Sequence, residues 1–201
     1  LLALRSGRPR PDLQRSYDYL VNGQYDNKDC TFIEGVRHLL PGMLLEVDLA
    51  SRRPTKPKIW WQPSIAETSR LSFAEAVEAV RERFLQNIRL HLRSDVPLGS
   101  ALSGGIDSSA VVCAIRHVEP DVPIHTFSYI AQGSDVSEES WVDMVNECTG
   151  AVPHKVQASA ADLVRDLDTL ITAQGEPFGS TSIYAQYRVF QLAKDSGITV
   201  T

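Results

Sequence analysis

The chain has 201 residues, enough to bury the core of one α/β domain or to contain parts of two. Its formal net charge is −5, from 20 lysines and arginines against 25 aspartates and glutamates, and this acidic balance argues against a nucleic-acid partner, which requires a basic surface. No stretch approaches the roughly 20 apolar residues that cross a bilayer, and three widely spaced cysteines make neither a disulfide framework nor a CxxC metal pair. We therefore expect no membrane partner and a reducing, cytoplasmic location.

The first third of the chain contains short strand-like pieces. Residues 31–33 and 43–48 have the character of strands, and the composition changes over residues 51–58, which are rich in arginine, lysine and proline. We expect two domains, a β-rich one over residues 1–66 and another over residues 67–201. The arginines near the start are expected to form a solvated basic run: Arg5, Arg8, Arg10 and Arg15.

A regular helical pattern begins at Ser72. Ser72 and Glu75 form a capping box, in which the serine side chain accepts from the glutamate amide and the glutamate side chain reaches back. Apolar residues then recur at helical spacing and define one face: Phe73, Val77, Val80, Phe84, Ile88 and Leu92. We expect a long amphipathic helix that serves as scaffold.

Strands and helices alternate over the rest of the chain. The expected strands are residues 96–102, 124–130 and 153–156, with a fourth from residue 198. The expected helices are one that includes residues 110–115, one over 138–149 that ends at Gly150, one opened by Ser159 and Asp162, and one over 180–196. This alternation predicts an α/β fold with a parallel sheet and helices on both faces, in which ligands bind at the carboxyl ends of the strands.

The most informative segment follows the first of these strands: Ser103, Gly104, Gly105, Ile106, Asp107, Ser108 and Ser109. The first amides of a helix lack internal partners, and the positive end of the helix dipole favours an anion. Gly104 and Gly105 let the backbone approach an oxygen-rich ligand, the serines add hydroxyl donors, and Asp107 is placed to hold a metal ion on the same phosphates. An ordinary Gly-Ser turn is the alternative, but a strand before and a helix after the segment favour a nucleotide site.

The segment resembles the signature of the PP-loop ATP pyrophosphatases, which cleave ATP between its α and β phosphates. It is not a Walker A loop, because no Gly-Lys-Ser/Thr occurs in the chain. Other stretches resemble the glutamine-hydrolysing asparagine synthetase family: residues 93–99 before the loop, Glu138-Glu139 with Gly150 and His154 after it, the turn at residues 175–178, and residues 32–42 upstream.

This resemblance implies a fold, a reaction and a set of site residues. Residues 67–201 would begin a PP-loop, adenine nucleotide α-hydrolase-like synthetase domain, and residues 1–66 would end a β-rich Ntn-type glutaminase domain. The family uses ATP and Mg²⁺ to adenylate aspartate, and ammonia from glutamine then displaces AMP. The implied ATP site consists of Leu102 and Tyr129 at the adenosine, of Ser103, Gly104, Gly105, Ser108 and Ser109 at the phosphates, and of Asp107 at Mg²⁺. Glu176 would lie near the aspartate pocket.

The resemblance also points to parts that this sequence lacks. The family's glutaminase cysteine is not matched by Cys30, Cys113 or Cys148, and its second acidic loop would follow Thr201. We expect a piece of a longer ligase that is inactive alone and contains no catalytic residue of its own, with a homodimer as a candidate assembly of the parent. The alternatives are a related enzyme that closes β-lactam or lasso-peptide rings and a catalytically incomplete nucleotide-binding module. His125 and His154 are expected to be packed or surface histidines.

Overall fold

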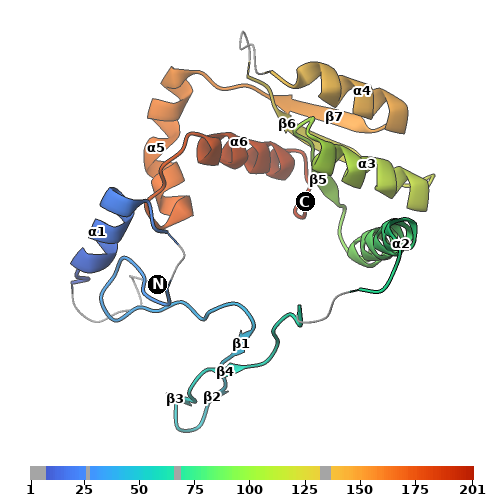
Figure 1. Cartoon of the computed structure of the whole chain (residues 1–201). Coiled ribbons are helices and arrows are strands. Elements are labelled where there is room, and N and C mark those ends of the chain that lie inside the picture. The colour runs from blue at the N-terminus through green and yellow to red at the C-terminus, as the bar shows by residue number, and fades with distance from the viewer. Residues whose placement is uncertain (1–7, 26–27, 66–68, 132–136) are drawn as a thin grey trace. The chain divides into compact units, whose positions relative to one another are not determined.

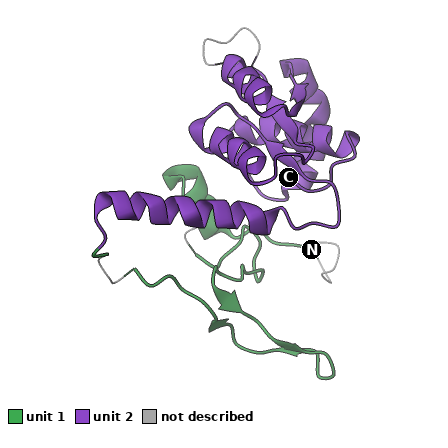
Figure 2. Ribbon diagram, turned by 90° about the vertical axis from the view of Figure 1, so that its right-hand side faces the viewer, with its two compact units in different colours: residues 1–70 green, residues 71–201 purple. Residues whose placement is uncertain are grey.

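The computed structural model describes residues 8–25, 28–65, 69–131 and 137–201. The chain divides into two compact units, residues 1–70 and residues 71–201 (Figure 2). The domain boundary expected between residues 66 and 67 falls within residues 66–68, outside the described residues. No helix in the described part of the chain combines the length and the apolar character needed to cross a membrane.

The first unit contains one helix and four very short strands. Helix α1, Leu13–Asn22, was not predicted; Asp12 opens it by accepting a hydrogen bond from the Arg15 amide at 2.8 Å, and Gly23 ends it in the left-handed conformation. Strand β1, Met43–Leu44, pairs antiparallel with β4, Lys58–Ile59, and β2, Val47–Asp48, pairs with β3, Arg53–Pro54. Residues 31–33 form only an isolated bridge, between Ile33 and Pro11, instead of the expected strand.

Arg15 corrects the prediction of a solvated arginine run. Its side chain is 3% exposed, its Nη1 donates to the Gln24 carbonyl at 3.0 Å, and its guanidinium lies 5.1 Å from the centre of the Phe32 ring. Tyr19 and Tyr25 surround the same ring, with centroids 5.4 and 6.0 Å away. Arg15 therefore belongs to the small core of the first unit, whereas Arg8 and Arg10 are exposed and Arg5 lies outside the described residues.

The second unit begins with α2, Phe73–His91, which is followed in chain order by β5 Gly99–Ala101, α3 Ile106–Val118, β6 His125–Tyr129, α4 Glu139–Thr149, β7 Val152–Val156, α5 Ala160–Gln174 and α6 Ser182–Asp195 (Figure 1). The strands are parallel, as predicted, and lie in the order β5-β6-β7. The expected fourth strand is a single parallel bridge between Val200 and Leu98, in which the Gly99 amide donates to the Val200 carbonyl at 2.9 Å. Val200 therefore extends the sheet on the side of β5 opposite to β6.

Helices cover both faces of this sheet, which confirms the predicted fold class. Thr126 of β6 faces α4, where its hydroxyl donates to Asn146 Oδ1 at 2.6 Å. Phe127, the next residue, points to the opposite face and packs with Val189 of α6, as the period of two in a strand requires. The two cores are Leu102, Val112, Ile124 and Val142 under α3 and α4, and Phe127, Val189, Ala193 and Ile198 under α6. Each buried valine, leucine, isoleucine or phenylalanine side chain among them contributes about 2 kcal/mol.

The capping predictions are confirmed, and α2 forms as the predicted long helix. The Ser72–Glu75 and Ser159–Asp162 capping boxes are both formed, and Gly150 ends α4 in the left-handed conformation. On α2, however, only Ile88 of the expected apolar face is buried, and Phe73 is 86% exposed. Helical periodicity predicts which side of a helix is apolar, but it does not predict how much of that side packs against other residues of the chain.

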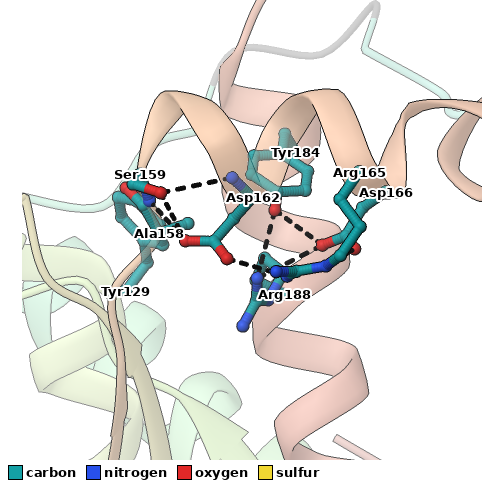
Figure 3. A network of polar contacts seen from close by, with 8 residues as sticks. All are labelled: Tyr129, Ala158, Ser159, Asp162, Arg165, Asp166, Tyr184 and Arg188. Atoms are coloured by element: carbon teal, nitrogen blue, oxygen red, sulfur yellow. Dashed lines mark hydrogen bonds and ion pairs between the residues drawn. The ribbon is translucent and has the colours of Figure 1, made fainter.

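A polar network joins α5 to α6 (Figure 3). Asp166 of α5 accepts from the Tyr184 hydroxyl at 2.7 Å and from Nη1 of Arg188 at 3.2 Å, both on α6. Arg165 pairs with Asp166 at 3.1 Å and with Asp162 at 2.8 Å. The network thus continues from the first turn of α5 into the middle of α6.

Candidate functional site

The predicted phosphate loop lies at the carboxyl edge of the parallel sheet. Strand β5 ends at Ala101, residues 102–105 turn, and α3 begins at Ile106. Because β5, β6 and β7 are parallel and each is followed by a helix, α3, α4 and α5 all begin at this edge. From β5 the chain adds β6 and then β7 on one side, and Val200 pairs on the other side of β5. The order of the strands therefore reverses at β5, and open α/β sheets usually bind their ligands at such a switch point.

Hydrogen bonds between the serines fix the shape of the loop. The Ser108 hydroxyl donates to the Gly105 carbonyl at 3.1 Å and accepts from the Ser103 amide at 3.2 Å. The Ser103 hydroxyl accepts from the Gly105 amide at 3.3 Å and lies 3.1 Å from the Ser108 hydroxyl. The structure therefore brings Ser103, Gly105 and Ser108 together, with the two hydroxyls side by side.

Gly104 is required in this loop for two reasons. Its φ is +88°, in the left-handed region that disfavours any side chain. A Cβ at this position would also lie 2.9 Å from both Cβ and the carbonyl oxygen of Glu138 and 3.3 Å from Cβ of Trp141. The start of α4 therefore packs directly on the loop at Gly104, and only glycine fits between them.

The start of α3 offers hydrogen-bond donors to an anion. Gly105 is the N-cap residue and supplies no side-chain cap, and the first helical bond runs from the Ser109 amide to the Gly105 carbonyl at 3.1 Å. The amides of Ile106, Asp107 and Ser108 precede this bond, so they are the donors that an α-helix leaves without internal partners. The half-buried Ser109 lies in the same first turn. These donors and the helix dipole make the loop suitable for a phosphate.

Asp107 lies exposed in the first turn of α3, where a cation bound to the same phosphates would be within its reach. Within residues 8–25, 28–65, 69–131 and 137–201, no three histidine, cysteine, aspartate or glutamate side chains are grouped as metal ligands. The donor set fits Mg²⁺ in the way common at nucleotide sites, where one carboxylate, phosphate oxygens and water complete the coordination.

The other predicted site residues are less directly placed. Leu102 is 1% exposed in the core under α3, and its amide donates to the Phe127 carbonyl at 2.9 Å, so its carbonyl is the group it can offer to a ligand. The Tyr129 hydroxyl donates to the Ala158 carbonyl at 3.4 Å, which turns its ring toward the β7–α5 connection and leaves its backbone for a ligand (Figure 3). Glu176 is half-buried directly after Gly175, the residue that ends α5.

The structure pairs two histidines that the sequence did not connect. Nδ1 of His125 on β6 lies 3.0 Å from Nε2 of His154 on β7, and the Ser196 hydroxyl lies 3.3 Å from Nδ1 of His154. The His154 ring stacks on Phe127, with centroids 4.7 Å apart. Burial, and then the neighbouring His125, lower the pKa of His154 below its usual value. Because side chains alternate between the two faces of a strand, the sequence predicts that His125 and Phe127 of β6 share a face. The contact between His125 and His154 also depends on the register of β6 and β7, which the sequence does not give.

Comparison with known proteins finds similar proteins over part of this chain. The chain is 30% identical over 118 residues to a putative glutamine-hydrolysing asparagine synthetase 2 of Methanocaldococcus jannaschii, covering 59% of this chain and 23% of that protein. It is 38% identical over 91 residues to the amidase chry2 of Gibberella zeae, covering 44% of this chain and 13% of that protein. Among solved structures, an NH3-dependent NAD synthetase from Campylobacter jejuni matches at 15% identity with a TM-score of 0.42, covering 61% of this chain and 54% of that one.

The family assignment rests on a match longer than half of the chain. The model of the asparagine synthase family matches residues 79–201, a segment that includes the phosphate loop, all three strands of the parallel sheet and the helices that cover both of its faces. The chain spans less than a quarter of the length of the Methanocaldococcus relative. On the family match, this chain belongs to the asparagine synthase family.

Proposed function

We propose that the second unit of this chain binds ATP and that the whole protein uses it for amide synthesis. The observation that carries the proposal is the start of α3, where the amides of Ile106, Asp107 and Ser108 follow a glycine loop held in shape by the Ser103 and Ser108 hydroxyls. The β and γ phosphates of ATP would accept hydrogen bonds from these amides and from the hydroxyls. Adenosine would lie along the carboxyl edge of the sheet, against the carbonyl of Leu102 and the backbone of Tyr129.

The proposed reaction places the concentrated negative charge of the leaving group on the loop. An oxygen of the aspartate side-chain carboxylate would attack the α phosphorus, the bond to the β phosphate would break, and pyrophosphate would leave. Ammonia derived from glutamine would then attack the acyl carbon and displace AMP, which yields asparagine. The amides and hydroxyls of the loop would stabilise the pyrophosphate as it forms, and Mg²⁺ held by Asp107 would neutralise part of its charge.

Several further assignments belong to the same proposal. Glu176 would contribute to the aspartate pocket, and residues 1–66 would be the last part of an Ntn-type glutaminase domain that supplies the ammonia. Because the Methanocaldococcus relative is more than four times as long as the segment that it shares with this chain, amide synthesis, glutamine hydrolysis and dimer formation are proposed for the whole protein.

A second candidate keeps the ATP site and changes the acceptor. The relative from Gibberella zeae is named an amidase, although it is 38% identical to this chain over the shared segment. A related enzyme that closes β-lactam or lasso-peptide rings would also use the same loop. Exchange of labelled pyrophosphate into ATP by the whole protein distinguishes the two candidates. We expect exchange in the presence of aspartate. Exchange with another acid but not with aspartate would favour the second candidate.

Titration calorimetry with ATP tests the nucleotide site in the 201-residue chain itself. We expect Asp107→Asn to weaken binding about tenfold in the presence of Mg²⁺ and to leave binding without Mg²⁺ unchanged or slightly stronger, because it removes a metal ligand and a negative charge. The matched control is Asp121→Asn, which neutralises another exposed aspartate, beyond the C-terminal end of α3. Equal effects of the two substitutions would remove Asp107 from the site.

A further inference from the structure

The position of α4 sets the shape of the phosphate loop. The carbonyl oxygen of Glu138 and Cβ of Trp141 occupy the space in which a side chain at residue 104 would lie. Glu138 is the N-cap residue of α4, and its own side chain makes no capping hydrogen bond. The contact with the loop is therefore made by a backbone oxygen and two Cβ atoms in the first turn of a helix, and its position depends on what holds that helix end in place.

Lys155 holds this end of α4 against the sheet. It lies on β7 next to the carboxyl edge, and its ammonium is 2.8 Å from Oε1 of Glu139 and 2.6 Å from Oδ1 of Asp143. Its side chain is 28% exposed, so the ion pairs are partly shielded from water. Hydrogen bonds to Asp143 and Glu139 raise the pKa of Lys155, and the lysine remains charged at neutral pH.

The two carboxylates need the lysine between them. Glu139 and Asp143 are four residues apart on α4, so they project from the same side of the helix as neighbours, and like charges at this spacing repel each other. Without Lys155, the repulsion would be relieved by movement of the side chains or of the first turn itself. That first turn is the part of α4 that touches Gly104.

We infer that Lys155 is a positioning residue for the phosphate loop: through Glu139 and Asp143 it fixes the first turn of α4, and that turn fixes Gly104. Lys155 acts on the loop from β7, two strands away from β5, and no contact with the nucleotide is required. The consequence for ATP affinity rests on the proposed function, whereas the consequence for the order of the loop does not.

The experiment compares three variants of the full chain. Lys155→Met keeps the length of the side chain and removes its charge, and Lys155→Arg restores the charge. The control, Lys58→Met, removes an ammonium 2.9 Å from Glu46 in the first unit. Amide hydrogen exchange is followed by mass spectrometry in peptides covering residues 103–109 and 138–143. We expect Lys155→Met to accelerate exchange at least fivefold in both peptides, and Lys155→Arg and Lys58→Met to leave it within twofold of the original chain.

A nucleotide titration provides the second measurement. We expect Lys155→Met to weaken ATP binding five- to tenfold while Lys155→Arg retains affinity within twofold. Faster exchange in 138–143 with no change in 103–109 would overturn the inference, because α4 would then move without the loop. If the original chain binds no ATP but Lys155→Met still accelerates exchange in the loop, the proposed function fails and the positioning role stands. Should Lys155→Met not fold, Lys155→Gln also removes the charge between Glu139 and Asp143, and the same acceleration is expected in both peptides.

Discussion

Nδ1 of His125 and Nε2 of His154 lie 3.0 Å apart and join two neighbouring parallel strands on the face of the sheet that α6 covers. Only one proton can lie between the two nitrogens, so protonation of both rings would replace a hydrogen bond with repulsion. Burial lowers the pKa of His154, and the charge of His125 lowers it further.

The pair should make the second unit less stable in mild acid. Because the pKa of His154 is lower in the folded chain than the usual 6.5, the unfolded chain binds more protons below that value. The contribution to stability is complete above pH 6.5 and is lost as the pH falls through 6.5 toward the folded pKa. We expect the urea midpoint to fall between pH 7 and pH 5, and to fall less in His125→Gln.

NMR titration of the imidazole resonances checks the cause. His154 should titrate below the pH at which histidine in a short peptide titrates, and His125→Gln should move its midpoint upward. A midpoint unaffected by that substitution would leave burial as the only cause and would rule out coupling between the two rings.

Gly104→Ala should disrupt the loop more than strain alone explains. The new Cβ would meet the Glu138 carbonyl at 2.9 Å while φ is +88°, and a side chain in the left-handed region costs about 1–3 kcal/mol before any clash. Gly150→Ala is the matched control, since Gly150 has φ +60° and nothing within 4 Å of its Cβ position. We expect both variants to unfold at lower urea concentration, but only Gly104→Ala to lose ATP binding. If Gly104→Ala still bound ATP, the shape of the loop at Gly104 would not be required for nucleotide binding.

The residues that sequence predicted best are those whose structure is local. The Ser159–Asp162 capping box, the Gly150 helix end and the strand, turn and helix around Ser103 each depend on a few consecutive residues, and all of them are confirmed. The alternation of predicted strands and helices along the chain also predicted the parallel sheet.

The features that sequence missed depend on contacts between distant segments. Arg15 is buried where its guanidinium lies over the ring of Phe32, a residue distant in the sequence, and its place in the basic run does not distinguish it from the exposed Arg8 and Arg10. The packing of Glu138 on Gly104 likewise requires the register of β5, β6 and β7, which sets where α4 begins. Cys113 lies inside the apolar run of α3 and is nevertheless exposed, since one apolar run around a helix does not reveal which side meets the sheet.

The first turn of α5 should loosen in strong acid before the rest of the unit. Hydrogen bonds from the Ser159 hydroxyl and amide, together with Arg165, lower the pKa of Asp162 to about 2. Because this folded value lies below the usual 3.8, the stability that the ionised carboxylate contributes is present above pH 3.8 and is lost as the pH falls toward 2. The protection of amides near residues 159–163, taken relative to the intrinsic exchange rate at each pH, should therefore fall over that interval, and Ser159→Ala should lower it already at neutral pH. Protection that stays constant between pH 4 and pH 2 would contradict the role of Asp162 as a cap.

Tyr184→Phe should weaken the attachment of α5 to α6 without changing either helix. Tyr184 is 4% exposed, and its hydroxyl donates to Asp166 at 2.7 Å and accepts from Arg188 at 3.1 Å, so removal of the hydroxyl leaves both partners short of one hydrogen bond in a poorly hydrated place. A loss of about 1–3 kcal/mol in unfolding free energy is expected, measured by urea denaturation at pH 7. Tyr187→Phe is the control, because it removes a hydroxyl from the same helix, and the hydrogen bonds among Asp166, Tyr184 and Arg188 do not involve that hydroxyl. If the two variants were equally stable, the hydroxyl of Tyr184 would contribute nothing beyond its ring, and the polar attachment of α5 to α6 would rest on the ion pair between Asp166 and Arg188.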